Sequence, residues 1–182
     1  MAGWIQVGGR WRWKVDETRA HGTWRIEIFE TPECKKLLRV VEIPDNMTTN
    51  DGLNHQIGVE LAGTAQITTW YGALIANSGY SALAAGDTMA SHAGWTEDQN
   101  YSESVRQTWT PGAVSGQQVT NPTAMTFTMN ATTTIRGAFL TSSNTKGGTT
   151  GTLFATGLFD ATQALVSGNT LKVTYTYSMT GS

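Results

Sequence analysis

The stretch Leu171-Lys172-Val173-Thr174-Tyr175-Thr176-Tyr177-Ser178-Met179 decides the fold class of this 182-residue chain. Apolar and polar residues alternate along it. Because successive side chains of an extended strand point to opposite faces, the pattern predicts a half-buried β-strand. The turn-forming residues Ser167-Gly168-Asn169 come directly before it. The residues predicted to face the core are Leu171, Val173, Tyr175, Tyr177 and Met179.

The same signals recur along the rest of the chain. Residues 133–141 are apolar on both faces, which predicts a central strand, and residues 142–151 form a turn after it. Several strands separated by Gly, Asn and Pro turns predict an all-β protein whose core is a β-sandwich or is jelly-roll-like. Further strands are predicted over residues 4–7, 10–15, 24–28, 37–43, 67–75, 105–110, 125–129 and 152–155.

One short helix is predicted over residues 51–61. Leu53, Ile57 and Leu61 recur at four-residue spacing, which is typical of one helix face. The preceding residues 48–51 have side chains that cap a helix N-terminus.

Residues 1–45 are predicted to form a Trp-rich β extension that serves assembly, and residues 46–182 the sandwich core. Charge is concentrated early: residues 1–60 hold 8 Lys or Arg and 9 Asp or Glu, and residues 61–182 hold 4 and 5. A hairpin is expected about Gly8-Gly9, and the alternating runs 10–15 and 24–28 are predicted to be neighbouring antiparallel strands.

Aromatic and basic residues alternate in this N-terminal region. Trp and Arg are favoured at protein interfaces, so these residues are predicted to contact a partner. Aromatic side chains next to cations can also bind single-stranded nucleic acid. Acidic residues close to these basic residues offset their charge, however, and the net charge of the chain is −2. Nucleic acid is therefore not expected as a partner. The predicted interface residues are Trp4, Trp11, Trp13, Trp24, Arg10 and Arg12.

Hydrolase-type side chains gather within residues 87–98, but no G-x-S-x-G pattern is present and an enzyme is not expected. We interpret this group as structural. Its members are Asp87, Ser91, His92, Glu97 and Asp98.

Cofactor and metal sites are not expected either. In residues 146–151 the Lys precedes the glycines and a strand follows, unlike a phosphate-binding loop. The histidines His21, His55 and His92 are scattered and Cys34 is the single cysteine, so metal-ligand spacing and an internal disulfide are lacking. The adjacent acids Glu97-Asp98 are a weak signal for Ca²⁺.

Segments between residues 50 and 177 carry a family resemblance. They are 49–54 (TNDGLN), 67–74 (ITTWYGAL), 85–97 (AGDTMASHAGWTE), 136–140 (RGAFL), 146–153 (KGGTTGTL) and 168–175 (GNTLKVTY). Their arrangement resembles a family of small structural proteins of tailed-bacteriophage virions. The resemblance implies a virion component without catalytic chemistry.

The function expected from this resemblance is that of a capsid-decoration, or cement, protein that bridges capsid subunits. The partners expected are the major capsid protein and copies of the chain itself, in a homo-oligomer such as a trimer. The expected location is the capsid surface of the virion, after synthesis in the cytoplasm of a bacterial host. A membrane is not expected, because no apolar run approaches the roughly 20 residues that span a bilayer.

Two alternatives remain open from the sequence. One is a tail or head–tail connector protein of the same kind of particle. The other is a carbohydrate-binding β-sandwich module, in which Trp95, Tyr101 or Trp109 would stack on sugar rings.

Overall fold

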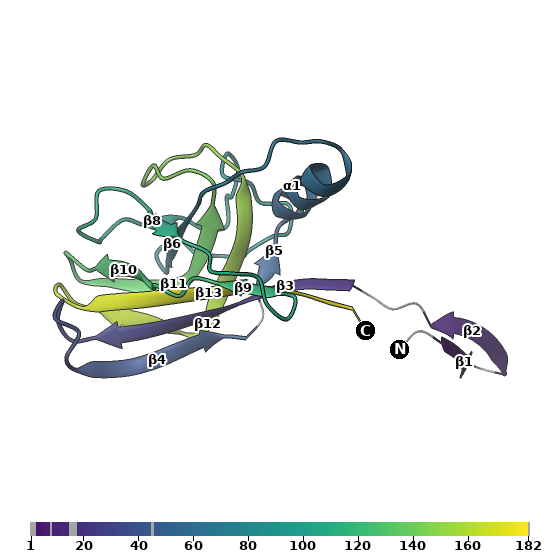
Figure 1. The fold of residues 1–182 in the computed structure, drawn as a ribbon. Coiled ribbons are helices and arrows are strands. Elements are labelled where there is room, and N and C mark those ends of the chain that lie inside the picture. The colour runs from purple at the N-terminus through teal and green to yellow at the C-terminus, as the bar shows by residue number, and fades with distance from the viewer. Residues whose placement is uncertain (1–2, 8, 15–17, 45, 182) are drawn as a thin grey trace.

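Two antiparallel sheets stack as a sandwich in the computed structural model, which describes residues 3–7, 9–14, 18–44 and 46–181 (Figure 1). The all-β prediction is therefore confirmed. The first sheet has the order β10-β13-β3-β4, and β9 also pairs with β13. Its strands are β3 (Thr18–Phe29), β4 (Leu37–Ile43), β9 (Gln118–Thr120), β10 (Met125–Thr128) and β13 (Thr170–Gly181).

The second sheet has the order β5-β12-β11-β6-β7, and β8 pairs with β6. β11 lies between β12 and β6, so the prediction of a central strand over residues 133–141 is confirmed. The strands of this sheet are β5 (Met47–Thr48), β6 (Trp70–Ala76), β7 (Glu97–Asp98), β8 (Gln107–Trp109), β11 (Thr133–Thr141) and β12 (Leu153–Leu165).

β13 has the alternating burial that its sequence predicts. Leu171, Val173, Tyr175 and Tyr177 are buried, and the Thr and Lys residues from 172 to 176 between them are half-buried on the opposite face. Met179 differs, with 45% of its surface exposed, because it lies near the end of the strand on the rim of a groove. The strand pairs with β3 along its whole length, from Thr170 opposite Phe29 to Gly181 opposite Thr18.

The helix α1 (Asn50–Leu61) confirms the predicted span. Thr49 is its N-cap and accepts a hydrogen bond from the Gly52 backbone N–H at 3.1 Å. Gly52 is required here because a Cβ would lie 2.4 Å from the Phe154 carbonyl oxygen on β12. Within the described residues, no helix is long and apolar enough to cross a membrane.

The N-terminal hairpin, β1 (Gly3–Val7) with β2 (Arg10–Lys14), forms a separate two-stranded sheet. Val7 pairs with Arg10, so the turn is where the sequence predicts it, although Gly8 and Val15 lie outside the described residues. The predicted pairing of residues 10–15 with 24–28 is wrong, because β2 pairs with β1 while β3 pairs with β13 and β4.

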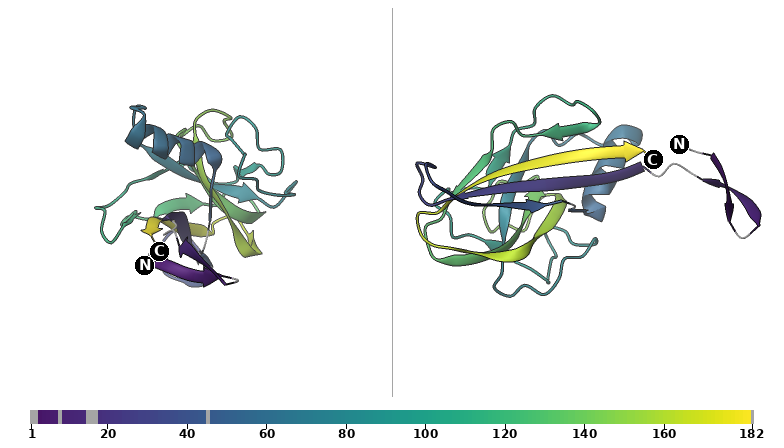
Figure 2. Two further views of the ribbon diagram at one scale, coloured as in Figure 1. Left: turned by 90° about the vertical axis from the view of Figure 1, so that its right-hand side faces the viewer. Right: turned by 90° about the horizontal axis from the view of Figure 1, so that it is seen from below.

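The predicted boundary at residue 45 does not match the sheets. β3 and β4 belong to the sandwich, whereas the hairpin forms a two-stranded sheet of its own (Figures 1 and 2). The reason is that β13 needs a long partner strand, and β3 supplies the alternating apolar face that pairs with it.

A buried amide ties the first sheet to β8 of the second. The Asn121 side-chain oxygen accepts from the Tyr175 backbone N–H at 2.7 Å and from the Trp109 indole N–H at 3.1 Å. Its amide nitrogen donates to the Thr123 and Val173 carbonyl oxygens at 2.9 and 3.1 Å. All four hydrogen-bonding positions of the side chain are thereby used.

We predict that Asn121→Ala lowers the free energy of unfolding by about 2–4 kcal/mol, because buried donors and acceptors on β13 and Trp109 lose their partner. Urea unfolding monitored by circular dichroism measures the change. The matched control is Asn130→Ala at an exposed position, expected to change the free energy by less than about 0.5 kcal/mol. Equal losses in the two variants would contradict the role of Asn121.

Candidate functional site

The hairpin carries five of the six predicted interface residues: Trp4, Arg10, Trp11, Arg12 and Trp13. Its register places Trp4 opposite Trp13 and Trp11 opposite Gln6. Except for Arg10, which is exposed, their side chains lie outside the described part of the structure. Their role at an interface therefore stays a prediction.

Trp24 does not belong with this set, so its assignment to the interface is corrected. It is 1% exposed on β3, and its ring packs on Tyr175 with centroids 4.3 Å apart. Its neighbours Ile26 and Ile28 are also buried, so this face of β3 is core. The alternation that predicted an apolar face was right, but the face is covered by the protein itself.

The loop aromatics offered for sugar stacking are buried as well. Trp95, Tyr101 and Trp109 are 1%, 0% and 6% exposed. A ring that stacks on a sugar must be open to solvent on one face, so these residues do not form a carbohydrate platform. Their ring edges are instead bonded inside the protein, as Trp109 is to Asn121.

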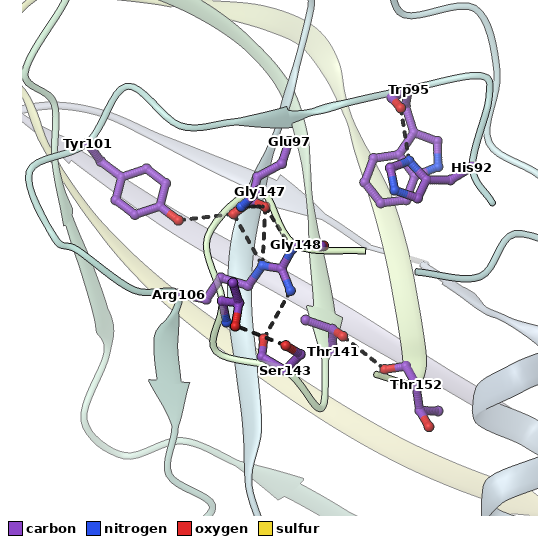
Figure 3. Close-up of polar contacts among 11 residues, drawn as sticks. His92, Trp95, Glu97, Tyr101, Arg106, Thr141, Ser143, Gly147, Gly148 and Thr152 are labelled. Carbon is purple, nitrogen blue, oxygen red and sulfur yellow. Dashed lines mark hydrogen bonds and ion pairs between the residues drawn. The ribbon is translucent and has the colours of Figure 1, made fainter. Parts of the chain in front are cut away.

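The hydrolase-type residues are bonded into the loop that carries them. Asp87 accepts from the Trp95 indole N–H and from the Ala84 backbone N–H, both at 2.9 Å. The His92 ring stacks on Trp95 at 4.1 Å, with Nδ1 3.0 Å from the Trp95 carbonyl oxygen (Figure 3). These contacts place His92 on a tryptophan ring and give it a structural role.

Glu97 and Asp98 are adjacent in sequence but have separate partners. Asp98 accepts from the Asn100 backbone N–H at 2.8 Å and from the Thr133 hydroxyl. Glu97 is paired with Arg106. In the described part of the chain, no three His, Cys, Asp or Glu residues are grouped as a metal ion would require.

The ion pair of Glu97 with Arg106 is buried, with side chains 5% and 1% exposed. The guanidinium reaches Glu97 at 2.8 Å and also donates to the Ser143 and Gly148 carbonyl oxygens at 3.0 and 2.7 Å (Figure 3). Glu97 in turn accepts from the Gly147 backbone N–H at 2.8 Å. The pair therefore clamps the β11–β12 loop to the segment between β7 and β8.

Lys146 adds a second contact to this clamp. Its ammonium lies 4.1 Å from the centre of the Tyr101 ring and donates to the Tyr101 carbonyl oxygen at 2.8 Å. Residues 146–151 connect two antiparallel strands, as the hairpin-loop prediction states, and Lys146 has a structural partner.

An apolar groove of about 800 Å³ lies between α1 and the ends of both sheets. We define the groove by the residues that line it. From α1 and the following loop these are Leu53, His55, Gln56, Ile57, Val59, Glu60, Leu61, Gln66 and Ile67; from the sheets they are Ala20, Trp70, Trp109, Val119, Leu140, Phe154, Tyr175, Tyr177 and Met179.

Aromatic rings form one wall of the groove. The centroid distance from Trp70 to Phe154 is 5.0 Å, from Phe154 to Tyr177 5.1 Å, and from His55 to Trp70 5.6 Å. The Tyr177 hydroxyl donates to the Gln56 side-chain oxygen on α1 at 2.7 Å, which fixes the helix to this wall. A preformed apolar hollow with few polar groups is the usual form of a binding site.

The opposite wall is the apolar stripe of α1. Gly52 is the buried residue of this helix, whereas Ile57 and Leu61 are 57% and 83% exposed. An apolar stripe at this spacing ordinarily packs on a core. Here Leu53, Ile57 and Leu61 line the groove instead, so this apolar surface has no cover among the described residues.

No protein-family model matches the chain, and no curated protein sequence matches it. The resemblance to tailed-phage virion proteins therefore stays a prediction.

Arg106 and the groove are the features that sequence reasoning missed. Arg106 is one of only four Lys or Arg residues in residues 61–182, and an isolated charge in such a region is a signal for a buried pair. The spacing of Leu53, Ile57 and Leu61 predicted the helix. The same spacing does not show whether another part of the fold packs on these residues.

We predict that Arg106→Met lowers the free energy of unfolding by about 3–5 kcal/mol, because Glu97 is left as a buried and unpaired charge. Chemical denaturation measures this. The control is Arg25→Met, which removes the exposed pair with Glu27 and should cost less than about 1 kcal/mol. A similar cost for both variants would contradict the clamp.

We predict that the free energy of unfolding falls at alkaline pH, and that it falls less steeply in the Tyr101→Phe variant than in the natural protein. Burial, followed by the nearby Glu97 carboxylate, raises the pKa of the Tyr101 phenol well above its ordinary value. Above about pH 10 the unfolded chain loses this proton and the folded chain keeps it, so the free energy of unfolding falls by up to about 1.4 kcal/mol per pH unit. Below that pH the contribution is fully present.

The measurement is urea unfolding of both proteins from neutral to alkaline pH. The neutral-pH values serve as the control, since they contain the lost hydroxyl bond to Glu97 but no titration of the phenol. Parallel pH profiles for the natural protein and Tyr101→Phe would show that Tyr101 is not a source of the alkaline loss.

Proposed function

We propose that this protein is a non-enzymatic structural subunit of a tailed-bacteriophage particle, a capsid-decoration protein that bridges capsid subunits at the particle surface. The resemblance over residues 50–177 supports the setting. The observation that carries the assembly role is the edge strand β4, which ends the first sheet with apolar residues on its surface.

β4 has the properties of a strand that meets a partner. Leu37, Leu38 and Val40 are 48%, 42% and 41% exposed. An exposed apolar edge strand pairs readily with another sheet, and chains that stay alone usually protect such an edge. A capsid subunit that adds a strand or a loop here would cover both the edge hydrogen bonds and the apolar side chains.

The polar groups of the described residues support a role that depends on the shape of the surface and not on side chains that gain or lose protons. Asp87, His92 and Glu97 are bonded within their loop or to Arg106. A tail or head–tail connector protein would use the same edge strand, so copy number separates it from a decoration protein. The carbohydrate-binding alternative is not carried further, because the aromatics that suggested it are buried.

We predict that this chain is present in purified particles at a copy number comparable to that of the major capsid protein. Quantitative mass spectrometry of the particles measures the ratio. A few copies per particle would instead indicate a position at the tail or the portal vertex. Absence from the particle would contradict the proposal.

Variants test which surface attaches the chain. Val40→Lys on β4 and removal of residues 1–17 are expected to prevent incorporation while the sandwich stays folded. The truncation ends before β3, because removing all of residues 1–45 would take β3 and β4 out of the core. Val114→Lys, at a position 74% exposed outside β4, is the matched control and should be incorporated normally.

A further inference from the structure

The groove is an open end of the hydrophobic core. Its lining includes Trp109, Leu140 and Tyr175, which belong to the core cluster between the sheets. α1 lies beside it, at the end of the sandwich where β13 ends (Figures 1 and 2). Because the sheets and the helix supply separate walls, the groove is a concave hollow and not a flat apolar face, which is the form that small-molecule sites take.

The groove also has the size of a small-molecule site. Its volume of about 800 Å³ falls within the roughly 300–1,000 Å³ that is usual for ligand pockets. The α1 residues that line it extend from Leu53 to Leu61, which corresponds to roughly 12 Å along a helix. The groove therefore suits an elongated molecule.

The end of α1 leaves this hollow open. The start of the helix is bonded to the sheets, because Asp51 accepts from a backbone N–H of β12 at 3.1 Å and Gln56 accepts from the Tyr177 hydroxyl at 2.7 Å. Farther along, Ile57 and Leu61 line the groove and are 57% and 83% exposed. An apolar molecule laid against these side chains would remove them from water, which is favourable.

A single carboxylate lies at this end of the groove. Glu60 is the only Asp, Glu, Lys or Arg in the groove lining, and it has no ion pair or hydrogen bond from its side chain within the described residues. It lies in the last turn of α1, which holds no basic residue. The C-terminal end of a helix carries partial negative charge, so an acid there is unfavourable and a cation is favourable. This end of the groove therefore favours a positively charged group.

We infer that the groove binds a small cationic amphiphile, an elongated apolar molecule with one positively charged amine head. Its apolar body lies between the stripe of α1 and the aromatic wall of Trp70, Phe154 and Tyr177, and its head lies beside Glu60. The inference concerns a ligand site and does not depend on the proposed role in a virion.

The probes are three compounds that share a dodecyl or closely similar chain and differ in the charge of the head: dodecyltrimethylammonium, dodecyl maltoside and dodecanoate. Each is titrated into the full-length chain below its critical micelle concentration, and calorimetry gives the stoichiometry and the affinity. We expect one saturable site per chain. The cationic probe is expected to bind most tightly, the neutral probe less tightly and the anionic probe least, because the head lies beside a carboxylate.

Two variants separate the apolar part of the site from the charged part. Ile57→Ser/Leu61→Ser removes apolar surface and is expected to weaken the binding of the cationic and neutral probes roughly tenfold or more. Glu60→Gln removes the charge and is expected to weaken the binding of the cationic probe roughly twofold to fivefold, as for an exposed ion pair, while the affinity for the neutral probe stays unchanged.

The matched controls alter similar residues outside the groove. Val114→Ser/Val166→Ser removes apolar side chains that are 74% and 54% exposed, and Asp160→Asn removes an exposed carboxylate on β12. Both controls are expected to bind every probe as the natural chain does. Circular dichroism first establishes that each variant is folded.

Four results would overturn the inference. The first is the absence of saturable binding of the cationic probe, and the second is an equal or higher affinity for the anionic probe. The third is an equal loss of affinity in the groove variants and their controls, as for detergent that binds without a defined site. The fourth is a natural chain that light scattering shows to be an oligomer and that Ile57→Ser/Leu61→Ser converts to a monomer, because a second copy would then occupy the groove.

Discussion

The pairing of β3 with β13 is the constraint on which the rest of the structure depends. These are the first and last strands of the sandwich, and they are hydrogen-bonded over twelve residues, from Thr170 opposite Phe29 to Gly181 opposite Thr18. The pairing brings Trp24 onto Tyr175 in the core. It also brings the start of β3 and the end of β13 together beside the groove, which Ala20 and Met179 line.

Polar groups that suggested chemistry are used to hold loops in place. The loops between β6 and β12 carry little regular structure, so they depend on buried polar contacts for a defined shape. The Glu97–Arg106 pair fixes two of these loops to each other, and Asp87 fixes a third through Trp95. Asn121 serves the same purpose between β13 and β8. These contacts hold the loops in a defined arrangement.

Among the described residues, apolar surface is left open at the edge of β4 and along the stripe of α1. Each would be costly in a chain that stayed alone, since exposed apolar surface favours association. The two surfaces lie on separate elements, β4 at the edge of the first sheet and α1 beside the groove. Two separate surfaces suit the proposed bridging role.

Local periodicity was enough to predict the all-β class, the spans of β4, β11 and α1, the alternating faces of β13 and the hairpin turn. These features depend on residues close together in the chain, where side-chain direction follows from backbone geometry. Residues 156–165 of β12 escaped prediction, and a register shift opposite residues 135–137 interrupts the pairing of this part of the strand. Gly137 marks that place, where a Cβ would lie 2.0 Å from the Gly157 carbonyl oxygen.

Only the tertiary structure decided which strands pair, which aromatics are buried and where the core stays open. Trp24 and Trp95 look like the hairpin tryptophans in sequence, yet packing places them in the core. The partner of Glu97 and the exposure of Ile57 and Leu61 on α1 likewise depend on segments far apart in the chain. Burial is set by the contacts that the whole fold creates, and a local pattern encodes which face of an element is apolar but not what covers it.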